Sequence, residues 1–217
     1  GFHRSFVESE VYGLKIIQMY LPSIHHRVSE IGAFAQRYNN EAPLITENHS
    51  SLLGFIGALG LTLLILTLFT ERVSPLLKKI AKLNIASILI GTIGGFGTLF
   101  AYMISPSIRG YNRISVFIFA LSLICIAFIL DRVFKKIPYL LSIVLIAAIG
   151  VFGIWDQTSD YFRFSPPVSS YTQYKNFFSS LEKQVGDSAV YQFPVVDFPD
   201  IVSYNRMGEY EHLRGYL

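Results

Sequence analysis

The chain has 217 residues, a formal net charge of +3 and one cysteine, and 52% of its residues are apolar. A mean hydropathy of +0.44, with the apolar residues gathered into long runs, is typical of a membrane protein and exceeds what a soluble domain needs. The positive charge lies in two short loops, which argues against a surface that binds nucleic acid. The single cysteine, Cys125, excludes a disulfide framework or a cysteine-based metal site within the chain.

The first residues are Gly1 and Phe2, without the basic, apolar and small-residue regions of a signal peptide. We therefore expect the chain to be a piece of a longer membrane protein, with further sequence at both ends. Part of the chemistry of the whole protein would then lie outside this sequence.

Residues 1–50 are polar and aromatic, and they predict an extracytoplasmic juxtamembrane segment with short amphipathic helices. An apolar stripe ends at Pro22, which cannot continue a helix. The stripe consists of Val11, Leu14, Ile17, Met19 and Leu21. This helix would lie at the membrane surface or against the other helices, and a short helix packed within a loop is an equal alternative. Residues 33–38 predict a second short helix before the turn signal Asn39-Asn40.

Four apolar runs follow, and each predicts a transmembrane helix. The runs are residues 51–70, 83–104, 114–130 and 137–155. A helix needs roughly 20 apolar residues to cross a hydrocarbon core of about 30 Å, and the third run is near the lower limit of roughly 17. Charged residues lie almost entirely between the runs. The predicted fold class of residues 51–155 is therefore membrane all-α, with four transmembrane helices.

Glycines recur in the first two runs at spacings that predict close helix packing. Gly54, Gly57 and Gly60 lie three apart, and Gly91 and Gly95 form a G-x-x-x-G pair. Small residues let two helix backbones approach in lipid, where packing contacts drive association. A mobile or ligand-lining helix is the functional alternative to this packing role.

Two short loops carry most of the Lys and Arg of the membrane region and predict its orientation. Residues 71–82 hold four of these cations and residues 131–138 hold three. Both loops should face the cytoplasm, which places the N-terminal segment, residues 105–113 and residues 156–217 on the other side. We therefore expect a multi-pass protein of the plasma (inner) membrane, with both ends of this chain extracytoplasmic.

Residues 156–217 predict the start of a small extracytoplasmic α/β domain. Residues 171–185 have an apolar face typical of an amphipathic helix, and Gly186 follows as its C-terminal cap. Residues 189–193 then predict a strand ended by Pro194. The aromatic face of the helix needs a partner that these residues do not supply, so we expect the domain to be incomplete here.

Sequence motifs of soluble enzymes are absent: the chain lacks G-x-S-x-G, a P-loop, G-x-G-x-x-G and H-E-x-x-H. Adjacent side chains on a helix point about 100° apart, so His25 and His26 are poor candidates for a shared metal and are expected to be interfacial histidines. No cofactor is evident, and a divalent metal has no support. Asn48-His49-Ser50 matches the N-glycosylation pattern, which is common by chance.

The loop of residues 105–113 is the most informative polar stretch. Arg109 and Arg113 lie four apart on the side of the membrane where positive charge is normally scarce. The planar donor fork of arginine suits phosphate or pyrophosphate. The predicted substrate-binding residues are Arg109, Arg113, Asn112 and Glu47, with the arginines as anchors for the phosphate of a lipid-linked substrate. The alternative is that both arginines extend towards lipid headgroups, and the position of the loop on the side away from the cytoplasm favours the phosphate anchor.

Carboxylates on the same side are candidates for general bases or metal ligands. Glu47 precedes the first apolar run and is well placed to approach the arginine loop. Glu8 and Glu10 are further candidates, although solvated surface positions are the expected fate of most of these groups. The pattern does not identify a catalytic residue.

Several stretches together resemble a known group of proteins. They are residues 8–15 (ESEVYGLK) with Leu21-Pro22, Glu47-Asn48, residues 109–113 (RGYNR), and the C-terminal YQFP of 191–194 with Phe198-Pro199 and EYEHLRGYL of 209–217. This pattern is similar to the later portion of large bacterial multi-pass membrane proteins of the GT-C glycosyltransferase-like group, sometimes labelled sugar translocases. The resemblance implies many membrane helices, a polyprenyl-phosphate-linked sugar donor and an extracytoplasmic active site. That group's acidic catalytic residue lies in its first extracytoplasmic loop, and no position here matches it.

The predicted function is therefore that of a portion of an integral membrane glycosyltransferase of the cell envelope. It would move a sugar from a lipid phosphate carrier to an extracytoplasmic acceptor, with its catalytic acid/base outside this chain. The expected partners are membrane lipid and the polyprenyl-phosphate-linked sugar, and no nucleic acid. A transporter or flippase of lipid-linked sugars is the first alternative, although the four runs lack charged residues in their interiors. A non-enzymatic membrane scaffold is the second.

Overall fold

The computed structural model describes residues 5–71, 73–108, 110–159, 168–186 and 188, and every named element in these ranges is a helix. The chain divides into a first unit, residues 1–162, and a second unit, residues 163–217. The first unit contains α1 (Val7–Val11), η1 (Ile16–Met19), α2 (Ser29–Glu41), η2 (Glu47–Ser50), α3 (Gly54–Leu66), η3 (Thr67–Phe69), α4 (Pro75–Gly91), α5 (Phe96–Met103), η4 (Tyr111–Ile114), α6 (Ser115–Phe134) and α7 (Tyr139–Gln157). The second unit contributes α8 (Val168–Val185).

Two helices of the described chain are long and apolar enough to cross a membrane: η4 continued by α6, and α7. They correspond to the third and fourth predicted runs. The first run forms α3 and η3, an apolar helix that is shorter than these two. The coarse prediction of an all-helical unit is therefore confirmed for the described residues, and two of its helices could cross a membrane by length and composition.

The second apolar run is not the single helix expected from the sequence. α4 ends at Gly91, residues 92–95 leave the helical conformation, and α5 follows. Gly94 has φ +70°, which residues with a side chain rarely adopt. The backbone at the break pairs with another segment, because Leu14 N–H donates to Gly91 O and Ile93 N–H donates to Leu14 O. These bonds satisfy groups that a broken helix would otherwise leave unpaired in an apolar surrounding.

α4 also begins earlier than the apolar run, inside the basic loop. The Ser74 side chain accepts a hydrogen bond from Leu77 N–H, and Pro75 occupies the first helical position. Both are strong signals for the start of a helix. Lys78, Lys79 and Lys82 consequently lie on α4 and not in a loop before it.

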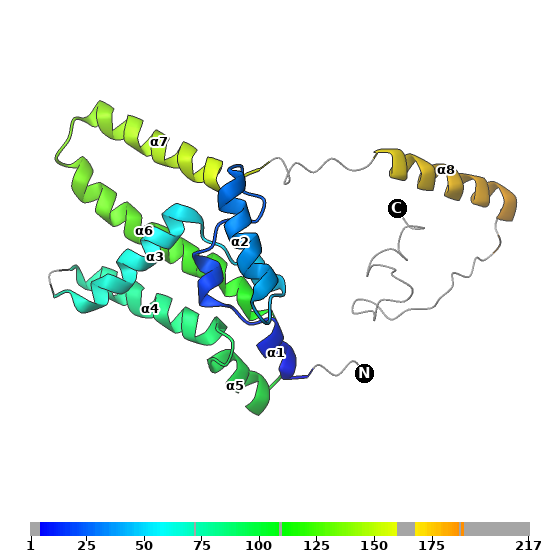
Figure 1. Ribbon diagram of the computed structural model, residues 1–217, viewed down its shortest axis with the longest axis horizontal. Helices are drawn as coiled ribbons and strands as arrows, with labels where there is room; N and C mark the ends of the chain where they lie inside the picture. Colours follow the sequence, from blue (N-terminus) through cyan, green and yellow to red (C-terminus); the bar gives the residue numbers. More distant parts are fainter. Residues whose placement is uncertain (1–4, 72, 109, 160–167, 187, 189–217) are drawn as a thin grey trace. The chain divides into compact units, whose positions relative to one another are not determined.

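α6 is the central helix of the first unit, with α3 and α4 packed along it (Figure 1). Its buried positions recur every three or four residues, at Ser115, Ile118, Ser122 and Cys125. α3 approaches this face through glycines: a Cβ on Gly60 would lie 2.5 Å from Ser122 O, and one on Gly57 2.6 Å from the Phe119 ring. The predicted close packing of the α3 glycines is confirmed.

The G-x-x-x-G pair of the second run acts differently from the prediction. Gly91 does make room for the Ile114 side chain at the start of α6. Gly95 instead lies in the break, where a Cβ would meet the carbonyl oxygens of Leu89 and Thr92 in its own chain. The pair therefore serves a turn and a helix contact, and it does not form one helix-packing face.

Residues 5–50 pack into the bundle and do not form one surface helix. The predicted stripe divides between α1, an extended stretch and η1. Leu14 and Met19 are fully buried in a core cluster with Leu53 of the α3 entry and with Leu61 of α3, whereas Ile17 is exposed. The second predicted helix is present as α2, which is longer than expected at both ends.

The directions of the helices define two ends of the first unit. At the polar end, Phe55 N–H of α3 donates to Asp156 Oδ2 of α7, and Ser51 Oγ donates to Asn112 O just before α6. At the basic end, Leu77 near the start of α4 packs with Cys125 in the second half of α6. We use "polar end" for residues 46–51, 110–113 and 156–158, and "basic end" for residues 71–82 and 131–136.

In the second unit, the predicted amphipathic helix is present as α8. Phe178, Leu181 and Val185 are half-buried and recur at helical spacing. Gly186 has φ +58°, and its N–H donates to Glu182 O, which confirms the predicted C-terminal cap. The predicted strand at residues 189–193 lies outside the described residues.

Candidate substrate-binding site at the polar end

Three of the four predicted substrate-binding residues meet at the polar end. Asn112 Nδ2 donates to Glu47 O at 3.1 Å, and Arg113 Nη2 lies 3.8 Å from Glu47 Oε2. The turn before α3 and the turn before α6 are therefore held side by side. Arg109 lies outside the described residues.

Asn48 fixes the turn that presents Glu47. Its buried side chain donates from Nδ2 to Leu44 O at 2.9 Å and to Gly13 O at 3.4 Å, while Oδ1 accepts from Thr46 N–H at 3.3 Å. Leu44 has φ +54°, a strained conformation for a residue with a side chain, and the bond to its carbonyl helps to hold it. Asn48 belongs to the N-glycosylation pattern, but in the folded protein its amide is enclosed and bonded.

Asn112 is suited to positioning its neighbours and less to contacting a ligand itself. It is 3% exposed, and it joins three segments. Its N–H donates to Tyr12 O at 3.3 Å, its carbonyl accepts from Ser51 Oγ at 3.4 Å, and its amide bonds Glu47. Its Oδ1 is buried without a hydrogen-bond partner among the described residues. The sequence-based role is thus modified: Asn112 sets the geometry in which Glu47 and Arg113 face each other.

Arg113 is the accessible charged group of the site. Its side chain is 77% exposed and that of Glu47 is 45% exposed. An exposed ion pair contributes at most about 1 kcal/mol, and the 3.8 Å separation is long for a charge-assisted hydrogen bond. The guanidinium lies back over Gly110, where a Cβ would come within 3.3 Å of Nε. The arginine is therefore held loosely enough for another anion to replace Glu47.

The carboxylates of α1 have different environments. Glu10 Oε2 accepts from Gly94 N–H at 3.0 Å, so Glu10 stabilises the break between α4 and α5 and is not simply solvated. Glu8 Oε2 is buried and has no hydrogen-bond partner in the described part of the chain. Within the same residues, no group of three or more His, Cys, Asp or Glu side chains is arranged to hold a metal ion.

A second polar cluster at this end was missed by sequence reasoning. His26 is buried, with Nε2 3.5 Å from Asp156 Oδ1. Val28 N–H donates to His26 Nδ1 at 3.0 Å, which leaves the ring hydrogen on Nε2 to face the carboxylate. Trp155 at the end of α7 packs edge-on against the His26 ring. No local pattern signals a pair whose members are so far apart in the chain.

Asp156 links this cluster to the bundle. Its Oδ2 accepts from Phe55 N–H at 2.8 Å and so caps the start of α3. Leu53, the residue before α3, supplies no side-chain cap. Asn48 and Ser50 precede α3 in the chain but lie in η2, and neither caps α3. The end of α7, the segment before α2 and the start of α3 are thereby joined.

Comparisons with protein families, with curated proteins and with solved structures find no match. The chemistry of the polar end is therefore inferred from its own residues.

Proposed function

We propose that the chain is a portion of an integral membrane glycosyltransferase whose polar end binds the phosphate of a lipid-linked sugar on the extracytoplasmic side. In this proposal the four apolar runs cross the membrane as α3 with η3, as α4 with α5, as α6 and as α7, and residues 156–217 begin an α/β domain. The basic end faces the cytoplasm because short loops rich in Lys and Arg are retained there. The sequence resemblance to GT-C-like proteins supplies the reaction class.

The observation that carries the proposal is the accessible, loosely paired guanidinium of Arg113. The Arg113 side chain is 77% exposed, so an anionic ligand can reach its guanidinium. Glu47 supplies only a 3.8 Å, solvent-exposed pairing. A phosphate group offers two oxygens to the planar donor fork and forms shorter, charge-assisted hydrogen bonds. Phosphate therefore competes with Glu47 for Arg113.

The chemistry assigned to these residues is binding and charge stabilisation. In glycosyl transfer the bond between sugar C1 and the phosphate oxygen breaks, and a bond from C1 to the acceptor oxygen forms. The acceptor proton passes to a base, and the lipid phosphate leaves with the bonding electron pair. Arg113 stabilises the negative charge on that leaving phosphate, while Asn112 holds the turn that presents the arginine.

Binding of a polyprenyl-phosphate-linked sugar to the purified protein tests the proposal. Arg113→Gln should weaken binding about tenfold or more, because a charge-assisted contact is lost. Glu47→Gln should tighten binding by about two- to fivefold, because the competing carboxylate is removed. Arg37→Gln, an exposed arginine on α2, is the matched control and should change nothing. Equal affinities for Arg113→Gln and Arg37→Gln would contradict the proposal.

A transporter of lipid-linked sugars is the second candidate, and the break between α4 and α5 favours it. Transporters often bind substrate where a membrane helix is interrupted. Here, however, Gly91 at the break lies against Ile114 at the start of α6, and not beside the middle of that helix. Reconstituted vesicles distinguish the two functions. A transferase forms a new glycoside, whereas a transporter moves the intact lipid-linked sugar across the bilayer.

A further inference from the structure

The basic end gathers cations from two helices. The α4–α6 basic surface consists of Lys78, Lys79, Lys82, Arg132, Lys135 and Lys136. Leu77 of α4 packs in one cluster with Cys125, Phe128 and Ile129 of α6. Because α4 runs antiparallel to α6, this contact places the start of α4 beside the end of α6. The cations of both helices therefore lie at one end of the unit.

Acidic side chains pair with only part of this surface in the described residues. Lys78 Nζ lies 3.3 Å from Glu71 Oε2, and Lys135 Nζ lies 2.6 Å from Asp131 Oδ2. Lys79, Lys82, Arg132 and Lys136 are exposed, and no described carboxylate pairs with them. The surface thus keeps a positive charge available to a partner.

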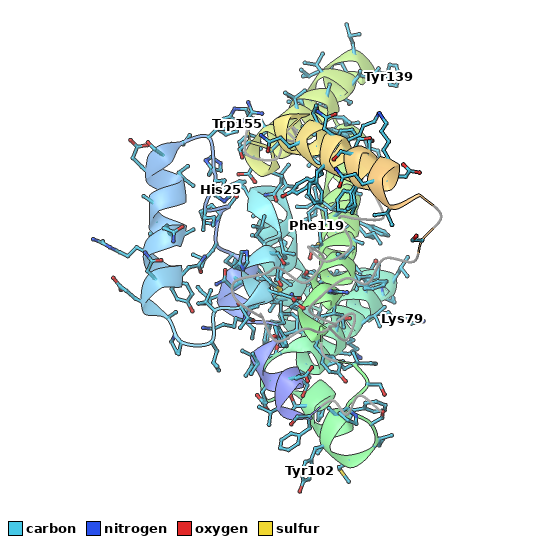
Figure 2. The ribbon with its side chains drawn as sticks, turned by 90° about the vertical axis from the view of Figure 1, so that its right-hand side faces the viewer. His25, Lys79, Tyr102, Phe119, Tyr139 and Trp155 are labelled. Carbon is cyan, nitrogen blue, oxygen red and sulfur yellow. The ribbon has the colours of Figure 1, made fainter. Side chains whose placement is uncertain are left out.

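Exposed apolar side chains adjoin these free cations. On α4, Lys79 lies three residues after Leu76 and four before Leu83, a spacing that puts all three on one helix face. Leu76 is 54% exposed and Leu83 is 57% exposed. Lys79 projects outward from α4 in Figure 2. Beyond the cations of α6, the first residues of α7 are also exposed and apolar, with Tyr139 and Leu140 foremost.

We propose that the α4–α6 basic surface binds an anionic phospholipid, with its headgroup among the exposed cations of that surface and its acyl chains along the exposed leucines of α4. A ligand for this surface needs a negative head and long apolar chains, and a phospholipid has both. A soluble phosphate would leave the leucines uncovered. Lys and Arg side chains near an anionic bilayer surface are attracted to it, and their charges act together.

This site goes beyond the proposed glycosyl transfer and lies at the opposite end of the unit from Arg113. It requires insertion in a membrane, but it does not require the sugar-binding function. A protein that binds anionic lipid at the basic end and no lipid-linked sugar at the polar end would support the one proposal and refute the other.

Thermal unfolding of the purified protein in a neutral detergent tests the inference. Phosphatidylglycerol should raise Tm, whereas phosphatidylcholine and soluble glycerol 3-phosphate should not. The variant Lys79→Gln/Arg132→Gln/Lys136→Gln should lose the shift or need at least tenfold more phosphatidylglycerol for it. The control Arg37→Gln/Lys175→Gln/Lys183→Gln removes the same number of exposed cations elsewhere and should keep the shift.

Two results would overturn the inference. One is an equal phosphatidylglycerol shift in both triple variants, and the other is an equal shift with glycerol 3-phosphate. If the first variant does not fold, the salt dependence of the wild-type shift decides. The Debye length is only about 3 Å at 1 M salt, so high salt should greatly reduce a Tm shift that depends on exposed charges. A Tm shift that does not depend on salt would refute the site.

Discussion

The two ends of the first unit are built on different principles. At the polar end, buried amides join the backbones of distant segments, as Asn48 and Asn112 do between the N-terminal residues and the starts of α3 and α6. At the basic end, the charged groups are exposed and pair locally, as in the Lys135–Asp131 pair one helical turn apart. The comparison shows that buried amides at the polar end hold distant segments together, whereas the charged groups at the basic end are available to the surroundings.

The largest effect should appear when a buried amide of the polar end is removed. Asn48→Ala leaves the carbonyl oxygens of Gly13 and Leu44 without their donor and creates a small cavity. The free energy of unfolding should fall by roughly 3 kcal/mol. Asn40→Ala, on the exposed surface of α2, should change it by less than about 0.5 kcal/mol. Denaturant unfolding in detergent measures both, and equal values would show that the polar end is not held by Asn48.

Glycine packing between α3 and α6 extends the comparison into the bundle. Gly60→Ala places a Cβ 2.5 Å from Ser122 O, and this overlap is relieved only if α6 moves. Destabilisation of about 1–3 kcal/mol should follow. The same change at Gly150 of α7 meets nothing within 4 Å and should be neutral or stabilising by up to about 1 kcal/mol through helix propensity. Thermal unfolding of the Gly60→Ala and Gly150→Ala variants separates the cost of the close contact from the gain in helix propensity. Similar losses of stability in both variants would refute the close packing.

A matched pair of carboxylates compares the ends directly. Asp156→Ala removes the cap on Phe55 N–H and the acceptor beside His26, and it should cost about 1–2 kcal/mol of unfolding free energy. Asp131→Ala breaks an exposed pair one turn apart on α6 and should cost no more than about 0.5 kcal/mol. Unfolding curves of the two variants measured under one condition test this order. A reversed order would be incompatible with the structure.

The smallest effect concerns pH at the start of α2. A hydrogen bond from its own backbone N–H, and one from the Ser29 hydroxyl, lower the pKa of Glu30 below its ordinary 4.5. A lowered pKa adds stability that is fully present above the unfolded-state value and is lost as pH falls through the folded-state value. Wild type should therefore exceed Glu30→Gln in Tm at neutral pH, with the difference vanishing in acid. A difference that grows in acid would contradict this assignment.

The sequence predicted well what depends on local composition. The long apolar helices α6 and α7, the glycine face of α3 and the Gly186 cap follow from run length and residue spacing. The second run was misread because Ser74 and Pro75 start the helix early and Gly94 interrupts it, and neither effect changes mean hydropathy. The insertion of Leu14 into the core depends on hydrogen bonds to the break, which no local pattern encodes.

The candidate site, like the fold, was predicted from the sequence only in part. The approach of Glu47 to the loop before α6 follows from the expected topology, since both precede helices that start at one end. The burial of Asn112 and the His26–Asp156 pair could not be predicted, because each depends on contacts between segments separated by many residues. A buried Asn and an exposed ligand-binding Asn look alike in one sequence.

The central claim is that the two ends lie on opposite sides of a membrane, with the polar end outside. Cysteine labelling tests it most directly, starting from Cys125→Ala, which removes the chain's single cysteine. In sealed cells, an impermeant thiol reagent should label Asn40→Cys, near the polar end, and should label Lys136→Cys only after the membrane is opened. Labelling of both positions from one side, or of Lys136→Cys alone in sealed cells, would contradict the account.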